Sequence, residues 1–318
     1  MQCKIVKHSF PMTFYRLLAI GLVFLHPIES TLGPGNRKSS SRHAEKSGSS
    51  SSKPVPSIPK DSLPPSDTNV LQRNLLREDI TPQSILENHG SYCSACSDIR
   101  QFSNPILIYI TPWNNRGYDL VKLFPQKFDY ISPVWFSLKR LDFEKYQIEG
   151  THDIDSKWIE TLKEKRSDIR IVPRVILENW SSKDIHALFQ SENEKQQLSL
   201  TLKNLLIEYD HLFDGYVFEI LAQFQGSSKE NVHHILNDIA EQIHAIESNT
   251  TRKKEVILAV PPVEDVFNQE DFEILSKYVD GFNIMTYDFS TKQQPGPVAP
   301  IGNYYFSFDK MKFFIFFF

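Results

Sequence analysis

From about residue 105 onward, short apolar runs alternate with longer stretches in which apolar residues recur at helical spacing. The runs are rich in β-branched and aromatic residues, which is typical of buried strands. Pro173 interrupts one run and cannot donate a ladder hydrogen bond, so a bend or bulge is expected there. The six predicted strands lie at 106–110, 128–138, 169–177, 213–221, 256–260 and 281–287.

The stretches between the runs carry helix signals. A helix is expected within 154–165, and two later helices begin at capping-box spacings, Ser181 with Asp184 and Ser227 with Glu230. In the last helix six apolar residues recur at steps of three and four, which places them on one face against a sheet. These residues are Val232, Ile235, Leu236, Ile239, Ile243 and Ile246.

The alternation of strands and helices predicts an α/β fold with a parallel sheet. Periodicity leaves two architectures open, a closed (β/α) barrel and an open doubly wound sheet. No Gly-x-Gly-x-x-Gly or Walker-type loop follows any run, which disfavours a nucleotide-binding open sheet. The pattern predicts no cofactor and no metal ion.

Residues 1–32 predict a signal peptide. Lys4, Lys7 and Arg16 precede an apolar stretch at 17–25, which is too short to span a bilayer as a helix but suits a signal core. Cleavage is expected within 30–33, and an uncleaved anchor is the alternative. The chain is therefore expected to be secreted or carried to the lysosome.

Residues 33–91 predict a disordered linker, because Ser, Pro and Lys dominate its first half and offer little apolar surface to bury. In an exported chain Cys93 and Cys96 are expected to be oxidised, either to a local disulfide or to an intermolecular one. Sequons begin at Asn179 and Asn249, and both are compatible with a glycoprotein made in that compartment.

The composition excludes one class of partner. The 318 residues are 40% hydrophobic and 23% charged, with a formal net charge of −4. These proportions are ordinary for a folded domain. No long basic run stands in the part expected to fold, so nucleic acid is excluded as a partner.

Two strand-end motifs resemble those of glycoside hydrolase family 18. Segment 213–221 resembles the family's fourth-strand pattern D-G-x-D-x-D-x-E, and Met-Thr-Tyr-Asp at 285–288 resembles its sixth-strand motif M-x-Y-D. Further strings resemble a chitinase-like branch of the family that is named for its interaction with a scavenger-type receptor. They stand at 92–95, 109–114, 131–135, 171–174 and 294–297. The resemblance implies a (β/α)8 barrel over 92–300, with the sugar site at the C-terminal ends of the strands.

The same resemblance implies that the catalytic acid is missing. In the family the last glutamate of the fourth-strand motif protonates the leaving oxygen, while the substrate acetamido group attacks. Alignment places Val217 and Glu219 at the motif's later aspartates and Leu221 at that glutamate, and leucine cannot donate a proton. Glu219 faces the same way but lies roughly 6.6 Å deeper by strand rise. Glu219 is therefore a weak candidate acid, and an interior carboxyl is the preferred interpretation.

The predicted saccharide-binding set combines family positions with strand-end residues. Tyr287 and Asp288 match the pair that holds the acetamido group in active relatives. The tryptophans can offer flat faces to sugar rings or serve as core packing, and the charged residues near the third strand end can contact sugar or pair with helices. The full set is Trp113, Trp135, Arg174, Glu178, Glu219, Met285, Tyr287 and Asp288.

The C-terminal region departs from the family pattern. No strand signal is found after the sixth, and residues 301–318 form an aberrant tail that ends in a Phe-rich run too short to cross a membrane. We therefore expect a C-terminally truncated barrel with about six of eight strands and two unpaired edges.

The leading interpretation is a chitinase-like protein that binds chitin-type or other oligosaccharides without cleaving them, with no membrane span. One alternative is a weak glycosidase that uses a displaced carboxylate, Glu219 or Glu178. The other is a receptor-interaction protein with no glycan role, whose partner is a scavenger-type receptor.

Overall fold

The computed structural model describes residues 65–317 except 251, 264, 291–294 and 297–312, and of residues 313–317 it describes the backbone alone. The expected signal peptide, the linker up to residue 64 and most of the expected aberrant tail lie outside the described residues. No helix in the described ranges is long and apolar enough to cross a membrane.

Residues 65–91, expected to be linker, contain regular elements instead. Strand β1 (Pro65–Ser66) pairs in parallel with β2 (Tyr92–Cys93). Helix α1 (Pro82–Asn88) begins after Thr81, whose side chain accepts a hydrogen bond from the Ser84 N–H. A disulfide joins Cys93 to Cys96 across the 3-10 turn η1 (Ser94–Cys96), so the local alternative holds and the intermolecular one is wrong.

The expected strands all form, but the second and third are each split in two. Strand β3 spans Ile106–Ile110, the second run gives β4 (Tyr130–Pro133) and β5 (Phe136–Asp142), and the third gives β7 (Arg170–Ile171) and β8 (Arg174–Leu177). The interruption in the third run falls at Val172 and Pro173, as the missing proline N–H predicts. An unpredicted strand, β6 (Lys145–Glu149), folds back antiparallel on β5.

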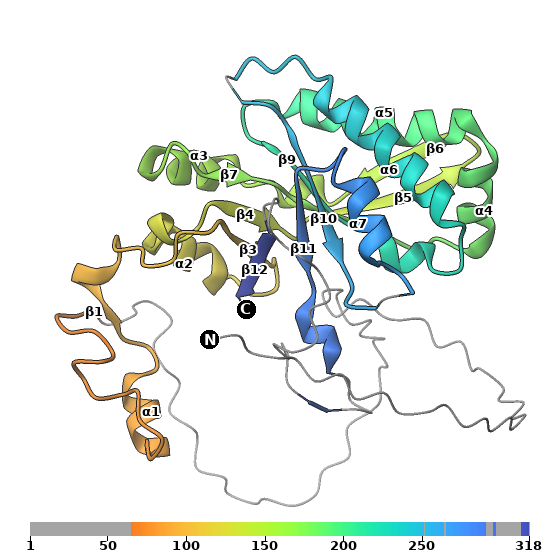
Figure 1. Cartoon of the computed structure of the whole chain (residues 1–318). Coiled ribbons are helices and arrows are strands. Elements are labelled where there is room, and N and C mark those ends of the chain that lie inside the picture. The colour runs from red at the N-terminus through yellow and green to blue at the C-terminus, as the bar shows by residue number, and fades with distance from the viewer. Residues whose placement is uncertain (1–64, 251, 264, 291–294, 297–312, 318) are drawn as a thin grey trace, which may run out of the picture. The chain divides into compact units, whose positions relative to one another are not determined.

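The remaining strands complete a parallel set: β9 (Gly215–Glu219), β10 (Glu255–Val260), β11 (Gly281–Ile284) and β12 (Phe313–Phe317). The sheet order is β6-β5-β8-β9-β10-β11-β12-β3-β4-β7. Since β4 pairs with β7 while their continuations β5 and β8 also pair, the order runs back on itself and closes a ring of seven strand positions. Figure 1 shows these strands gathered between α2 and α3 on one side and α4, α5 and α6 on the other.

The expectation of two unpaired edges is wrong for the described backbone. β12 lies between β11 and β3 in parallel register, with residue 313 opposite Phe282 and residue 315 opposite Ile106. The Phe-rich run therefore pairs on both sides. Because a closed ring has no free edge, this pairing removes the aggregation hazard that six strands alone would carry.

Helices cover the outside of the ring, where the larger hydrophobic core lies. They are α2 (Arg116–Leu123), α3 (Ser156–Lys165), α4 (Ser182–Gln190), α5 (Glu192–Glu208), α6 (Lys229–His244) and α7 (Gln269–Leu275). The capping box of Ser181 and Asp184 is confirmed. The one predicted at Ser227 is wrong, because α6 begins one residue later and its N-cap, Ser228, makes no side-chain cap. The apolar face predicted for α6 is buried as expected, with Ile246 partly buried.

A glycine permits the close approach of β9 and β10. Gly215 has φ +147°, and a Cβ added there would stand 1.9 Å from the backbone oxygen of Glu255. Only glycine fits this place. The requirement explains why an Asp-Gly step precedes the apolar run of β9.

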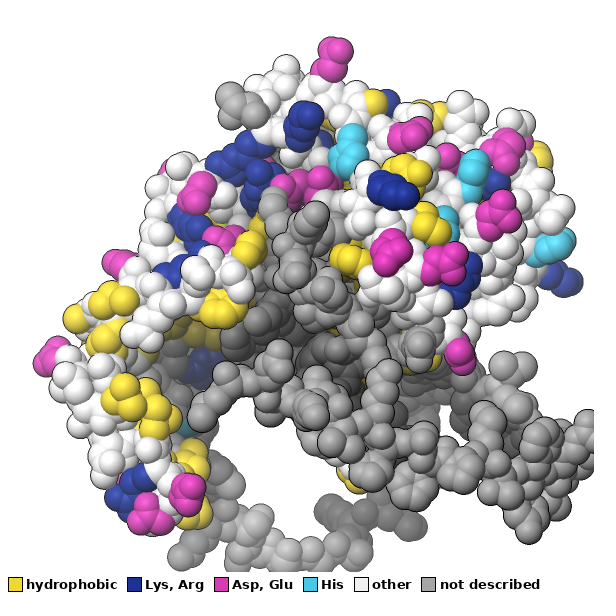
Figure 2. All heavy atoms as spheres, viewed as in Figure 1, with side chains coloured by type: hydrophobic (Ala, Val, Ile, Leu, Met, Phe, Trp, Pro, Cys, Tyr) yellow, Lys and Arg dark blue, Asp and Glu magenta, His cyan; other side chains and the backbone are white. Residues whose placement is uncertain are grey.

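Charged side chains of both signs are interspersed on the face drawn in Figure 2, where lysines and arginines lie beside aspartates and glutamates.

Inside the ring a second, smaller core forms. It contains Leu107, Tyr130, Val172, Val217, Ile257, Ala259 and Met285, with Tyr109 and Tyr287 packed against it.

Candidate saccharide site at the C-terminal ends of the strands

A layer of polar side chains lies on the inner core, toward the C-terminal ends of the strands. Side chains on a strand alternate between its two faces, so a residue two positions after an inward apolar residue also points inward. Leu107, Val172 and Val217 belong to the inner core. By this rule, and by the same alternation on β4 and β11, the inward polar layer consists of Tyr109, Ser132, Arg174, Glu219 and Asn283.

A buried ion pair connects two strands of this layer. Arg174 Nη1 on β8 donates to Glu219 Oε2 on β9 at 2.8 Å, and the two side chains are only 3% and 8% exposed. Interior charges need such partners, because an unpaired ion loses its hydration without compensation. The geometry supports the interpretation of Glu219 as a satisfied interior carboxyl, since one of its oxygens is committed to a guanidinium.

A buried tyrosine is fixed beside the ion pair. Asn283 Nδ2 donates to the Tyr109 hydroxyl at 3.0 Å. Burial raises the pKa of Tyr109 well above its usual value, and the nearby charge of Glu219 adds to the effect. Tyr109 is therefore a neutral phenol at any physiological pH, able to donate a hydrogen bond as well as accept one.

Three buried polar atoms of the layer have no hydrogen-bond partner among the described residues. They are Ser132 Oγ, Arg174 Nε and Asn283 Oδ1. One is an obligate donor, one is an acceptor and the hydroxyl can do either. Buried polar atoms are rarely left unpaired in native proteins, so such a group marks a place for polar contacts.

Tyr287 and Asp288 follow β11 and stand next to this layer. They lie in the 3-10 turn η5 (Thr286–Phe289), and Tyr287 packs against the inner core that contains Met285. Burial raises the pKa of Asp288 to about 6, and the charge of Glu219 contributes. The structure thus brings together five of the predicted set: Arg174, Glu219, Met285, Tyr287 and Asp288.

Three predicted residues lie elsewhere or apart. Trp135 is 5% exposed and packs in the outer core, where its Nε1 donates to the Tyr118 hydroxyl at 2.7 Å, so its prediction as a sugar contact is wrong. The charge of Glu178 acts on Lys139 of β5. Trp113, in the loop after β3, is 55% exposed and keeps a free ring surface.

Leu221 does not point into the ring. Strand β9 ends at Glu219, Ile220 leaves extended geometry with ψ −11°, and Leu221 opens the 3-10 turn η4 (Leu221–Phe224). Its side chain packs in the outer core with Phe224 and Leu275. The prediction that Leu221 occupies the inward proton-donor position is therefore wrong in its geometry, because Glu219 is the last inward residue of β9.

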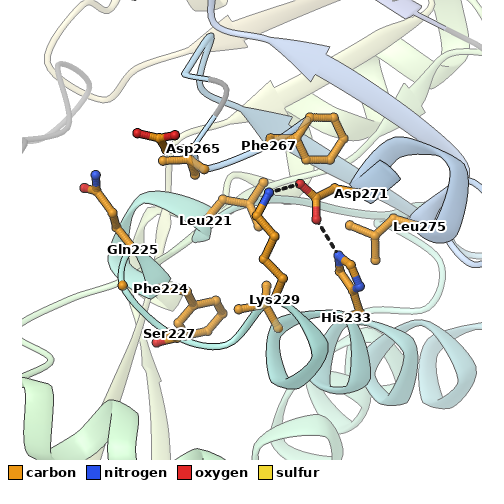
Figure 3. Close-up of a pocket in the computed structure, with 13 residues that line it drawn as sticks. Leu221, Phe224, Gln225, Ser227, Lys229, His233, Asp265, Phe267, Asp271 and Leu275 are labelled. Atoms are coloured by element: carbon orange, nitrogen blue, oxygen red, sulfur yellow. Dashed lines mark hydrogen bonds and ion pairs between the residues drawn. The ribbon is translucent and has the colours of Figure 1, made fainter. Parts of the chain in front are cut away.

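Figure 3 shows the small hollow that Leu221 lines. Its free volume is about 30 Å³, which is room for about one water. On its polar side Asp271 accepts hydrogen bonds from Lys229 and from His233 Nε2, the latter at 2.7 Å. This hollow is too small for a sugar ring.

Sequence reasoning missed Tyr109, Ser132 and Asn283. Each stands two residues after, or two before, an inward residue of a predicted strand, and each shares the inward direction of Glu219. The alternation rule applied from Glu219 outward would have found all three.

A comparison with protein-family profiles shows the family. A profile of glycosyl hydrolases family 18 matches residues 105–315. Similar solved structures include a chitinase from Chromobacterium violaceum, at 18% identity and a TM-score of 0.49, covering 63% of this chain and 62% of that one. Human YKL-39, described as a pseudo-chitinase with retained chitooligosaccharide binding properties, matches at 16% identity and 0.48, covering 60% and 54%.

A mutant class V chitinase from Nicotiana tobaccum in complex with NAG4 matches at 16% identity and a TM-score of 0.49, covering 61% of this chain and 55% of that one. The chain thus spans a little over half the length of these structures. The family profile, which matches most of the chain, shows that the chain belongs to glycosyl hydrolases family 18.

Proposed function

We propose that the C-terminal end of the barrel binds an N-acetylated oligosaccharide of the chitin type and does not cleave it. The observation that carries the proposal is the buried polar layer, in which the last inward carboxylate of β9, Glu219, is held by Arg174. Family membership and the matched position of Tyr287 and Asp288 support the same ligand class.

The unpartnered atoms of the layer suit an acetamido group. Such a group offers one N–H and one carbonyl oxygen. Once the side chains that cover the layer move aside, Asn283 Oδ1 can accept from the N–H, while Arg174 Nε or Ser132 Oγ can donate to the carbonyl. Trp113, exposed after β3, can add an apolar face for a neighbouring pyranose ring.

The position of the carboxyl groups supports the proposal that the chain does not cleave its ligand. A general acid must come within about 3 Å of the oxygen that it protonates, directly or through one water. Glu219 lies among the inner layer and its Oε2 already accepts a hydrogen bond from Arg174. The residues that follow it turn outward, so β9 presents no carboxyl nearer to its C-terminal end.

Titration calorimetry of the full chain with tetra-N-acetylchitotetraose tests this proposal. We expect a dissociation constant in the micromolar range, and binding at least about tenfold tighter than that of cellotetraose, which lacks the acetamido groups. Absence of binding, or equal affinity for the two sugars, would contradict the assignment.

The second candidate is a weak glycosidase that uses a displaced carboxyl. The observation that favours it is the pKa of about 6 at Asp288, which gives a partly protonated carboxyl near Glu219 in mildly acidic solution. Turnover of a chromogenic chito-oligosaccharide between about pH 5 and 6 is the test. Activity above the uncatalysed background that disappears in Glu219→Gln would establish this candidate. A rate no greater than the uncatalysed background would remove it.

We further propose that the chain is exported and is either secreted or lysosomal. The signal-like N-terminus, the two sequons and the Cys93–Cys96 disulfide support an oxidising compartment. Within the family, the strings at 92–95, 109–114 and 131–135 support kinship with chitinase domain-containing protein 1, for which a scavenger-type receptor is the partner to test. Retention of the full chain on cells that display such a receptor would support that pairing.

A further inference from the structure

We propose that Glu192, His234 and Asp238 form a zinc site that joins helices α5 and α6, outside the saccharide site. One ligand atom from each residue lies within 4.8 Å of the other two. The two helices pack against each other on the outer side of the ring (Figure 1). Neither the family motifs nor the saccharide proposal uses any of these residues.

The spacing on α6 allows two side chains to bind the same ion. His234 and Asp238 are separated by one helical turn, so their side chains share a face. His234 Nδ1 already lies 3.1 Å from Asp238 Oδ2. Ligands about 2.1 Å from a tetrahedral zinc ion stand about 3.4 Å apart, which this pair nearly matches without moving the backbone.

Glu192 supplies the third ligand from the first residue of α5. Its side chain is 76% exposed, so solvent leaves it room to change rotamer toward the other two ligands. Three protein ligands leave a fourth position for water. A partly exposed site of this kind is expected to bind in the micromolar range.

The donor set selects the kind of metal. One imidazole nitrogen with two carboxylate oxygens suits zinc or a similar transition metal. Calcium takes six to eight oxygen ligands, and magnesium requires near-octahedral oxygen coordination, so neither suits a site with a nitrogen donor and three protein ligands.

The local charges also favour a cation. Glu192 and Asp238 bring two carboxylates within 4.8 Å of each other, so a positive charge placed between them reduces their repulsion. Lys195 partly fills that role, because its Nζ lies 2.7 Å from Glu192 Oε1. A bound zinc ion must displace this ammonium from Glu192.

Zinc and the Lys195 ammonium compete for Glu192, so a zinc titration of suitable variants tests the site. The full chain is stripped with EDTA and titrated with zinc chloride near neutral pH. We expect saturable binding at this site, weakened more than about tenfold in His234→Ala and in Asp238→Asn. Lys195→Ala should tighten binding about threefold or more, because it removes the competing cation.

Matched controls separate this site from zinc held by other histidines. His211 is exposed and lies in the loop before β9, so His211→Ala should leave the site's affinity unchanged. Glu192→Gln serves if a variant on α6 fails to fold, because its side chain stands largely in solvent. Affinity that is equal in the wild type, His234→Ala and Glu192→Gln, or no zinc binding at all, overturns the proposal.

Discussion

Two aspartates at opposite ends of the barrel have opposite surroundings. Burial alone would raise the pKa of Asp129, before β4, but hydrogen bonds from Arg100, a backbone N–H and Arg166 hold it below the usual value. Burial raises the pKa of Asp288, after β11, to about 6, and the charge of Glu219 adds to the rise. The charged form of an aspartate is stabilised at one end of the barrel and disfavoured at the other.

The difference separates an end of the barrel that stabilises the fold from the end at which we propose that a ligand binds. Asp129 is held by two arginines and a backbone N–H, so its charge contributes to folding. Asp288 has its charged form disfavoured by the fold, which is common where a protein keeps a group for binding or catalysis. In barrels of this type the C-terminal ends of the strands carry function and the N-terminal ends carry stability.

The largest expected effect concerns the ion pair beside Asp288. Glu219→Ala leaves the Arg174 guanidinium buried without its partner, and we expect a loss of about 3–5 kcal/mol in the free energy of unfolding. Glu219→Gln keeps an oxygen acceptor and should cost about 1–2 kcal/mol. Urea denaturation measures both losses.

A double replacement isolates the cause of that loss. Arg174→Met with Glu219→Leu removes both charges and should recover most of the stability, because buried pairs replaced by apolar residues are often neutral. A Glu219→Ala loss below about 1 kcal/mol would show that the pair is not desolvated as the structure has it.

The next effect tests the stabilising end. Asp129→Asn removes charge-assisted hydrogen bonds and should cost about 2–3 kcal/mol at neutral pH. A lowered pKa gives stability above the ordinary value of 3.8 that is lost as the pH falls, so wild type and variant should converge in acid. Asp119→Asn on α2, where the side chain is 73% exposed, is the control and should change stability by less than about 0.5 kcal/mol.

The smallest effect has the opposite sign. Asp288 binds a proton more tightly in the folded chain, so its stabilising effect is complete below about pH 3.8 and is lost as the pH rises through about 6. Asp288→Asn should therefore stabilise the chain above pH 6. Allowing for partial exposure, the gain is about 1 kcal/mol, measured as thermal stability against pH. A variant that is less stable than the wild type at neutral pH would contradict the comparison.

Much of the fold follows from the spacing of apolar residues. The six strand positions, the start of α4 and the buried face of α6 are present as predicted. The pairing of β12 was not foreseen, because a short run of phenylalanines carries no period that identifies a strand partner. The β5–β6 hairpin was missed for a related reason, since its second strand is mostly polar and half-exposed.

The site was predicted in part, because motif alignment gives positions but not the place where a strand ends. Alternation would point Leu221 inward if β9 continued, yet the backbone turns at Ile220 and sends it into the outer core. Trp135 was equally undecidable from sequence, since it falls in the break between β4 and β5. Arg174 and Glu219 were each predicted, but their pairing depends on the register of β8 with β9.

We propose above all that the C-terminal end of the barrel, where Asp288 lies, binds saccharide. Titration calorimetry with tetra-N-acetylchitotetraose, comparing the wild type with Asp288→Asn, tests it most directly. We predict that the wild type binds and that Asp288→Asn binds at least about tenfold more weakly, although it is the more stable protein. Equal affinity of the two proteins, or no binding by the wild type, would contradict the account.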